Sequence, residues 1–313
     1  MLMNLVLRPT PIHQMNMKEP KMANAFRIAP AIAAAASVVI LRSRELGNNC
    51  HYIADNYPGQ ALSIVTPDEY NALRQKPEWA IRWGTTGATV ARETKVLNKA
   101  SAIKETLDKA SFRKKAADAG LAPRMWLTKD ELVRYEGDLD DGVIVRPNHH
   151  ARSEHLYHCT TLAGLDAAIA AINGPYYISE YVKKDRELRV FVVAGKAVIV
   201  LDKDPPRDRN NVSWGCVEEG ALRVLKWSQW PMFAVENAIK AFNLSKLDFG
   251  AVDVMVKGDK AYFLEINTAP EVWRYYGERL GEAFHYSINT SRDRIPTNQY
   301  NNWKDVAHPT LLA

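Results

Sequence analysis

Apolar and polar residues alternate in two short runs toward the C-terminal end of the chain, Ala251–Val256 and Ala261–Ile266. A polar, glycine-containing stretch around Lys257–Lys260 separates them, and two such runs joined by a short turn are typical of a β-hairpin. The register that buries one face pairs Val252, Val254 and Val256 with Ile266, Leu264 and Tyr262 in turn. This register requires a turn with an odd number of residues or a bulge in the hairpin.

The same register gathers three oxygen-bearing side chains on the other face of the hairpin. Asp253 lies opposite Glu265, and Asn267 follows one step along that face. Two carboxylates and a carboxamide suit a hard divalent cation such as Mg²⁺, which keeps further positions for water and phosphate oxygens. We therefore expect a metal site, and the alternative is a solvated hairpin face that carries ordinary charges.

Strand and helix patterns cover most of the preceding chain. Short apolar runs predict strands at Trp79–Trp83, Val143–Val145, Tyr176–Ser179, Leu188–Val193 and Ala197–Leu201. Leu97–Ala119 is predicted to be one helix, because Ile103, Leu107 and Ala110 form an apolar stripe. A second helix spans Val235–Phe242 and leads into the hairpin.

The N-terminal part of the chain predicts a small α/β lobe. Residues 1–22 are rich in methionine and are expected to be disordered, and the lobe would occupy residues 23–90. Within it, strands at Phe26–Ala29 and His51–Ala54 would flank a helix at Ala31–Leu46. The chain could start at either Met1 or Met22.

Composition and charge narrow the class of protein. A chain of 313 residues with 47% hydrophobic residues can bury a large core. Its formal charge of +5 is spread along the chain without a basic tract, which argues against a nucleic-acid-binding tail. A mildly basic protein suits a nucleotide substrate equally well.

Cysteine use and the N-terminal apolar run bear on the compartment. The three cysteines are far apart and lack any CxxC spacing, which favours a reducing compartment over a disulfide framework (Cys50, Cys159 and Cys216). Ile28–Leu41 looks superficially like a signal peptide, but it is too short to span a bilayer, and we favour a cytoplasmic helix over export.

The hairpin motif resembles a known family. Asp253, followed by Glu265-Ile266-Asn267 and then Thr268-Ala269-Pro270, is similar to the metal-binding motif of the ATP-grasp ligases. That family includes D-alanine–D-alanine ligase, the RimK-like enzymes and many phage-encoded carboxylate–amine ligases. The resemblance covers the chain from about Ile81 to about Val272.

The resemblance implies an α+β fold in which two lobes clamp ATP after a smaller N-terminal α/β lobe. The ATP-grasp domain would span residues 91–283, with a lid-bearing lobe at about 91–180 and a metal-bearing lobe at about 181–283. Residues 284–313 would form a C-terminal tail.

The resemblance also assigns the nucleotide contacts. Lys109 and Arg146 would contact the phosphates, and the adenine edge would lie against the segment Glu180, Tyr181 and Val182. Glu187 would accept hydrogen bonds from the ribose hydroxyls. A local ion pair between Glu187 and a neighbouring arginine on the same strand is the alternative.

A second set of residues would act on the transferred phosphoryl group. Arg189, on the same strand face as Glu187, would face the acceptor substrate or the acyl phosphate. Arg209 and Asn211 would close over the γ-phosphate, and Lys203 would share that task. Several cations suit the negative charge of such a transition state.

The chain departs from the family pattern at the lid. The loop Asn148–Ser153 contains no glycine, so its backbone amides cannot freely cradle phosphate, and the side chains of His149, His150 or Arg152 would replace them. A zinc site among the histidines of this region is disfavoured, because their spacing matches no standard metal motif.

The resemblance implies an ADP-forming ligase that uses ATP and Mg²⁺, with Mn²⁺ as an alternative ion, and joins a carboxylate to an amine through an acyl phosphate. The substrates would be small molecules or peptides, with no specific nucleic acid and no membrane partner. The enzyme would work in the cytoplasm, or in the host cytoplasm if a phage encodes it. The alternatives are a non-catalytic binding protein and a small-molecule kinase on the same fold.

Overall fold

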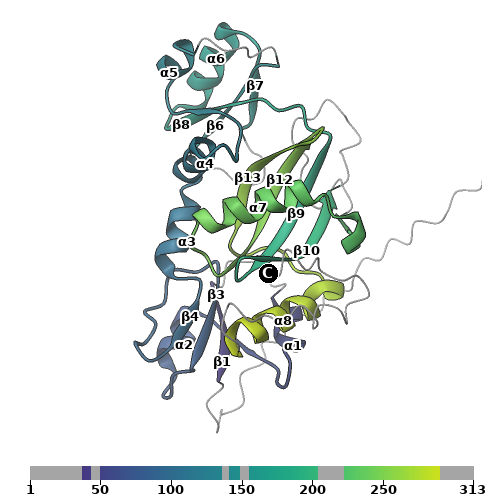
Figure 1. Ribbon diagram of the computed structural model, residues 1–313. Coiled ribbons are helices and arrows are strands. Elements are labelled where there is room, and N and C mark those ends of the chain that lie inside the picture. Colours follow the sequence, from purple (N-terminus) through teal and green to yellow (C-terminus); the bar gives the residue numbers. More distant parts are fainter. Residues whose placement is uncertain (1–36, 44–49, 136–140, 149–154, 204–221, 290–313) are drawn as a thin grey trace, which may run out of the picture. The chain divides into compact units, whose positions relative to one another are not determined.

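The computed structural model describes residues 37–43, 50–135, 141–148, 155–203 and 222–289, and its strands form three sheets (Figure 1). In the first sheet all strands are parallel, in the order β2-β1-β3-β4. Its strands are β1 (Val38–Arg42), β2 (Ser63–Val65), β3 (Trp79–Trp83) and β4 (Lys95–Leu97), with helices α1 (His51–Asp55) and α2 (Pro67–Ala72) between them. None of the helices in the described ranges is long and apolar enough to cross a membrane.

Two of the predictions for the N-terminal lobe are wrong. The helix predicted at Ala31–Leu46 is contradicted by β1, whose first residues Val38-Val39-Ile40 are β-branched and fit a strand buried on both faces. The strand predicted at His51–Ala54 is the short helix α1, which buries Ile53 and Ala54. The strand predicted at Phe26–Ala29 lies outside the described residues.

The second sheet is antiparallel, in the order β5-β8-β6-β7. Its strands are β5 (Met125–Trp126), β6 (Val143–Pro147), β7 (Tyr157–Cys159) and β8 (Tyr176–Glu180), and α5 (Lys129–Val133) and α6 (Leu162–Ile172) belong to the same lobe. Val145, Leu165 and Ile178 lie in one core that joins this sheet to α6.

The single helix predicted at Leu97–Ala119 is two helices, α3 (Ala100–Leu107) and α4 (Lys109–Asp118). Asp108 breaks the helix, because its carboxylate accepts a hydrogen bond from the amide of Ser111 at 3.1 Å and caps α4. The break turns Leu107 out of the predicted stripe, and its side chain is exposed. It also makes Lys109 the first residue of a new helix.

The third sheet is antiparallel, in the order β11-β10-β9-β12-β13. Its strands are β9 (Arg186–Val193), β10 (Lys196–Lys203), β11 (Leu222–Val224), β12 (Phe249–Lys257) and β13 (Lys260–Asn267), with a short 3-10 helix η1 (Trp227–Gln229) between β11 and α7 (Met232–Leu244). One face of this sheet packs on α7 through residues such as Val190, Val252 and Phe242. The other face contributes Phe191 and Phe249 to a core that includes α8 (Arg274–Asn289).

A bulge in the hairpin sets which side chains share a face. Two residues, Gly258 and Asp259, connect β12 to β13. Val254 pairs with Phe263 and Val256 with Ala261, so the predicted pairings of these valines with Leu264 and Tyr262 are wrong. Asp253 nevertheless pairs with Glu265, because the register shifts between Asp253 and Val254. The prediction of an odd turn or a bulge is confirmed, since an even turn alone would have put the two carboxylates on opposite faces.

Helices α1 and α8 pack so closely that two glycines of α8 have no room for a side chain. A Cβ atom at Gly277 would lie 2.7 Å from Cβ of Tyr52, and one at Gly281 would lie 2.8 Å from the carbonyl oxygen of Asn56. Backbone atoms of α1 therefore touch α8 directly.

We expect Gly277→Ala to lower the free energy of unfolding by about 1–3 kcal/mol, because the added methyl group forces the helices apart. The sign of the change in the free energy of unfolding is diagnostic, since alanine in an open helix position would stabilise the protein by up to about 1 kcal/mol. Urea denaturation compares the variant with Gly174→Ala, a position after the end of α6 where the new Cβ meets only an ordinary contact. A stabilised Gly277→Ala protein would contradict the close packing.

Candidate active site

One face of the third sheet changes from apolar to charged along its strands. Successive side chains of β9 alternate between faces, so Phe191 and Val193 share a face with Glu187 and Arg189. The two apolar residues lie in the core with α8. Glu187 and Arg189 form the charged part of this face. In the strand register, Asp253 of β12 lies directly opposite Arg189.

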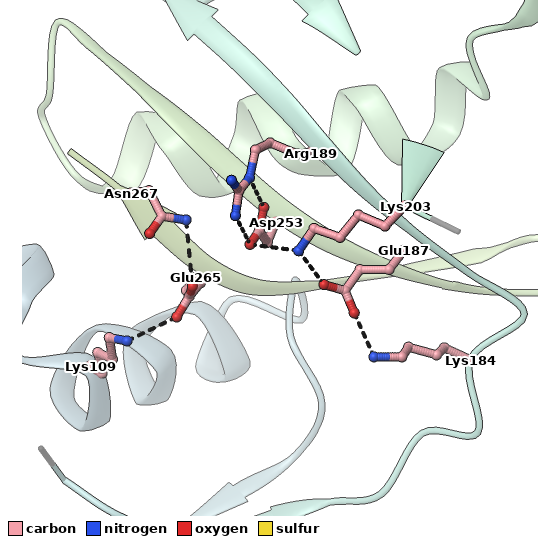
Figure 2. A network of polar contacts seen from close by, with 8 residues as sticks. All are labelled: Lys109, Lys184, Glu187, Arg189, Lys203, Asp253, Glu265 and Asn267. Atoms are coloured by element: carbon pink, nitrogen blue, oxygen red, sulfur yellow. Dashed lines mark hydrogen bonds and ion pairs between the residues drawn. The ribbon is translucent and has the colours of Figure 1, made fainter. Parts of the chain in front are cut away.

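Asp253 lies at the centre of a network of ion pairs (Figure 2). The Arg189 guanidinium donates to both carboxylate oxygens of Asp253, with Nε–Oδ1 at 2.8 Å and a terminal nitrogen to Oδ2 at 2.9 Å. Nζ of Lys203 donates to Oδ2 of Asp253 at 3.0 Å and also to Glu187. Glu187 in turn accepts from Nζ of Lys184 at 2.5 Å.

These contacts keep Asp253 ionised although it is buried. Burial alone would raise the pKa of Asp253, but the charges of Arg189 and Lys203 outweigh it and hold that pKa below its ordinary value. The same carboxylate, with Glu187, raises the pKa of the Lys203 ammonium against the effect of burial. The sheet thus presents a fixed anion with cations beside it.

Glu265 forms the second charged centre, beside the first. Its Oε2 accepts from Nζ of Lys109 at 3.0 Å, and its Oε1 accepts from the side-chain Nδ2 of Asn267 at 3.4 Å (Figure 2). Burial and the nearby Asp253 charge raise the pKa of Glu265, but Lys109 and Arg113 lower it more, so the net pKa is below the ordinary value. The three residues predicted to bind a metal therefore share one face.

Arg146 belongs to the same electrostatic environment. It is buried in β6, and burial is the main cause of its lowered pKa, while the charge of Glu265 acts in the opposite direction. The positive charge of Arg113 also lowers the pKa of Arg146. The Arg113 guanidinium lies over the Tyr177 ring, 5.5 Å from its centroid. Two buried or half-buried cations thus lie near the Glu265 carboxylate.

The segment predicted to hold adenine is ordered by other contacts. The Glu180 carboxylate accepts from two guanidinium nitrogens of Arg124, at 3.0 and 2.9 Å, so it is paired in this structure. The Tyr181 ring packs on His158 at 4.1 Å between centroids, and Val182 is buried. Adenine binding by this segment stays a prediction.

Two contributors to the site were not predicted, and two predicted residues are not among those that the structure describes. Arg113 follows Lys109 by four residues, so the helical spacing of α4 could have indicated it. Lys184 precedes Glu187 by three residues, and only its hydrogen bond to the Glu187 carboxylate in the structure identifies it as part of the site. Arg209 and Asn211 lie outside the described residues. So do the predicted lid residues His149, His150 and Arg152.

The donor set fits a hard divalent cation. Among the described residues, no group of three or more His, Cys, Asp or Glu side chains gathers, so a site here would rest on two carboxylates and one carboxamide. Such a set leaves positions for water and phosphate oxygens, as Mg²⁺ prefers. Each carboxylate already has cations as neighbours, and a divalent cation would take over part of that charge compensation.

Known structures resemble this one over most of its length. The ATP-grasp ligase PsnB, complexed with a phosphomimetic variant of a minimal precursor, Mg and ADP, has 14% sequence identity and a TM-score of 0.57, covering 81% of this chain and 99% of that one. D-alanine–D-alanine ligase from Bacillus anthracis, complexed with ATP, has 13% identity and a TM-score of 0.57, covering 82% and 98%. The macrocyclase MdnC from Microcystis aeruginosa MRC, bound with precursor peptide MdnA, has 13% identity and a TM-score of 0.55, covering 81% and 99%.

These likenesses establish the fold. The chain has the α+β ATP-grasp fold, as the resemblance of its hairpin motif predicted. No family model matches the sequence, and no curated protein matches it either.

Proposed function

We propose that this chain is an ATP- and Mg²⁺-dependent ligase that joins a carboxylate to an amine through an acyl phosphate. The observation that carries the proposal is the placement of Asp253, Glu265 and Asn267 on one face of a hairpin, at the point where cations from β9, β10 and α4 converge. Phosphoryl transfer depends mainly on positioning and charge stabilisation, and this face supplies both.

The metal ligands in this proposal are Asp253, Glu265 and Asn267. A bound Mg²⁺ neutralises phosphate charge and aligns the phosphates, and Mn²⁺ is an alternative ion. Lowered pKa values keep both carboxylates deprotonated, which metal ligation requires.

Arg189 and Lys203 would stabilise the transferred phosphoryl group. In the structure both cations pair with Asp253. A divalent cation on Asp253 would weaken these pairs and leave the guanidinium and ammonium groups to bind negative oxygens. The substrate carboxylate oxygen attacks the γ-phosphorus as ADP leaves, and the amine nitrogen then attacks the acyl carbon, losing a proton as phosphate departs.

Peptides and small amino acids are the proposed substrate classes. Two of the structurally similar proteins are described with precursor peptides, and a third is a ligase named for D-alanine. An enzyme that consumes ATP would work in the cytoplasm.

A screen for ADP release tests the proposed reaction. Amino acids and short peptides are supplied with ATP and Mg²⁺, and each product is identified by mass spectrometry. An amide product that needs an amine acceptor supports the ligase, whereas a phosphate ester would assign the chain to the kinases. No ADP release with any substrate would favour a non-catalytic binding protein.

Arg146→Ala is expected to weaken ATP binding at least about tenfold, because a charge-assisted phosphate contact contributes about 1.5–3 kcal/mol. Isothermal titration calorimetry with ATP and Mg²⁺ measures the affinity. Arg223→Ala is the control, since Arg223 is exposed and pairs with Asp202 instead. An unchanged affinity in Arg146→Ala would remove Arg146 from the nucleotide site.

A further inference from the structure

The loop after β3 leaves the parallel sheet at its switch point. Strand β1 pairs with β2 on one side and with β3 on the other, all parallel, so the chain turns to opposite sides of β1 in successive connections. In open parallel sheets, ligands bind outside the carboxyl ends of the strands at such a point. Here the segment Gly84–Thr89, with the sequence Gly-Thr-Thr-Gly-Ala-Thr, leaves β3, and it has no part in the reaction described above.

A buried guanidinium lies under this loop. The Arg82 side chain is 4% exposed, and its two terminal nitrogens donate to the carbonyl oxygens of Thr85 at 3.3 Å and Ala88 at 2.7 Å. Neither partner is an anion, and within the described part of the chain Arg82 takes part in no ion pair. Burial accordingly lowers the pKa of Arg82, and Tyr70 acts in the opposite direction. A buried charge without a counter-ion is costly, so the position calls for a compensating anion.

Arg82 also sets the direction of two peptide groups in the loop. No peptide bond in the described ranges is cis, and in a trans peptide the N–H points opposite to the C=O. Because the carbonyls of Thr85 and Ala88 point toward Arg82, the amide groups of Thr86 and Thr89 point away from it. Thr86 is half-buried and Thr89 is exposed, and each adds a hydroxyl group. The loop therefore presents outward donors over a buried positive charge.

Packing places this loop at the end of the face that carries Asp253. Trp83, the last residue of β3, stacks on Phe249 with ring centroids 5.4 Å apart and an interplanar angle of 19°. Phe249 and Asp253 lie on the same face of β12, four residues apart, which corresponds to about 13 Å along a strand. A substrate the size of an amino acid derivative or short peptide spans that order of distance.

We propose that the Gly84–Thr89 loop is a carboxylate-binding site that anchors the substrate. The amide and hydroxyl groups of Thr86 and Thr89 would donate to the carboxylate, and the charge of Arg82 beneath the loop would stabilise it. The anchored carboxylate is not the one that reacts. The identity of the ligand as a substrate rests on the proposed ligase function, whereas anion binding by the loop requires no nucleotide.

The test observes the loop directly in the full chain without nucleotide. Thr86–Gly87 is the one Thr-Gly dipeptide in the sequence, so labelling with ¹³C′-threonine and ¹⁵N-glycine selects the Gly87 amide signal in an NMR spectrum. N-acetylglycinate is titrated at constant ionic strength, with N-acetylglycinamide as the uncharged counterpart and inorganic phosphate as a second anion. We expect a saturable shift of the Gly87 signal with N-acetylglycinate and none with the amide.

Two threonine variants complete the design. Thr89→Glu places a negative charge in the loop at an exposed position and should weaken N-acetylglycinate binding at least about tenfold by repulsion. Thr160→Glu makes the same change at an exposed threonine after β7 and should leave the affinity unchanged. Arg82→Met, if folded, should also abolish binding.

The proposal is overturned if the Gly87 signal does not respond to N-acetylglycinate or responds equally to its amide. A response to phosphate alone would overturn the carboxylate assignment, and equal binding by Thr89→Glu would move the anion away from the loop. Since no titration contains ATP, a failure of the proposed ligase reaction would show in the ADP screen and not here.

Discussion

Asp253→Asn is expected to lower the rate of substrate-dependent ADP release by about 10²–10³-fold, because the substitution removes the charge of a proposed metal ligand without changing its volume. The variant should also be less stable, since Arg189 and Lys203 lose the anion with which both are paired. Glu265→Gln should cause a similar loss of rate with a smaller loss of stability, because its Lys109 partner is more exposed.

Asp202→Asn provides the matched control for this experiment. Asp202 is also a buried aspartate of the third sheet, and its carboxylate also pairs with two cations, Arg186 at 3.0 Å and Arg223 at 2.9 Å. It lies on the opposite face from Lys203, because successive side chains of β10 alternate.

We expect Asp202→Asn to lose stability but keep its turnover, whereas Asp253→Asn should lose both. This result would show that the loss of turnover comes from the site and not from breaking a buried ion pair as such. Normal ADP release by Asp253→Asn at saturating Mg²⁺ would refute the metal assignment.

The hairpin could be predicted from sequence because its information is local. Alternating valines, a short turn and the positions of Asp253 and Glu265 lie within one short segment, and they required either an odd turn or a bulge. The position of the bulge was not predicted. Both registers bury apolar residues, so the pattern alone did not distinguish Phe263 from Leu264 as the partner of Val254.

The errors in the N-terminal lobe and in the first helix have separate physical causes. A run of alanines has high helix propensity, but the strand at Val38–Arg42 is decided by burial against both faces of a parallel sheet. At Asp108 a local side-chain cap competed with the continuation of a helix whose apolar stripe looked unbroken. In the first case tertiary packing overrode propensity, and in the second a polar side chain overrode the stripe.

The ion pairs of the site could not be predicted because they depend on pairing between distant strands. Arg189 meets Asp253 because β9 lies beside β12, although the two residues are far apart in sequence. Their individual roles were suggested by the family resemblance, whereas their mutual neutralisation follows only from the sheet order. The consequence is that the carboxylates of Asp253 and Glu265 lie beside cations from other elements.

Asn98 connects the first sheet to the start of β12, and its side chain is fully buried. Its Nδ2 donates to the carbonyl oxygen of Phe249 at 3.0 Å, and its Oδ1 accepts from the amides of Asp248 at 2.7 Å and Phe249 at 3.1 Å. The amide of Asn98 itself donates to the Asp248 carboxylate at 2.6 Å. One side chain thus satisfies three backbone groups at the point where β12 begins.

Asn98→Ala is therefore expected to lower the free energy of unfolding by about 3–4 kcal/mol, from about 1 kcal/mol for each lost hydrogen bond and about 1 kcal/mol for alanine in a left-handed conformation. Asn173→Ala isolates the second contribution, because Asn173 also has a positive φ, 47° against 66° for Asn98, but is exposed at the end of α6. Urea denaturation should show a difference of about 2–3 kcal/mol between the two variants. Equal losses would mean that the side-chain hydrogen bonds of Asn98 add nothing to stability beyond its backbone conformation.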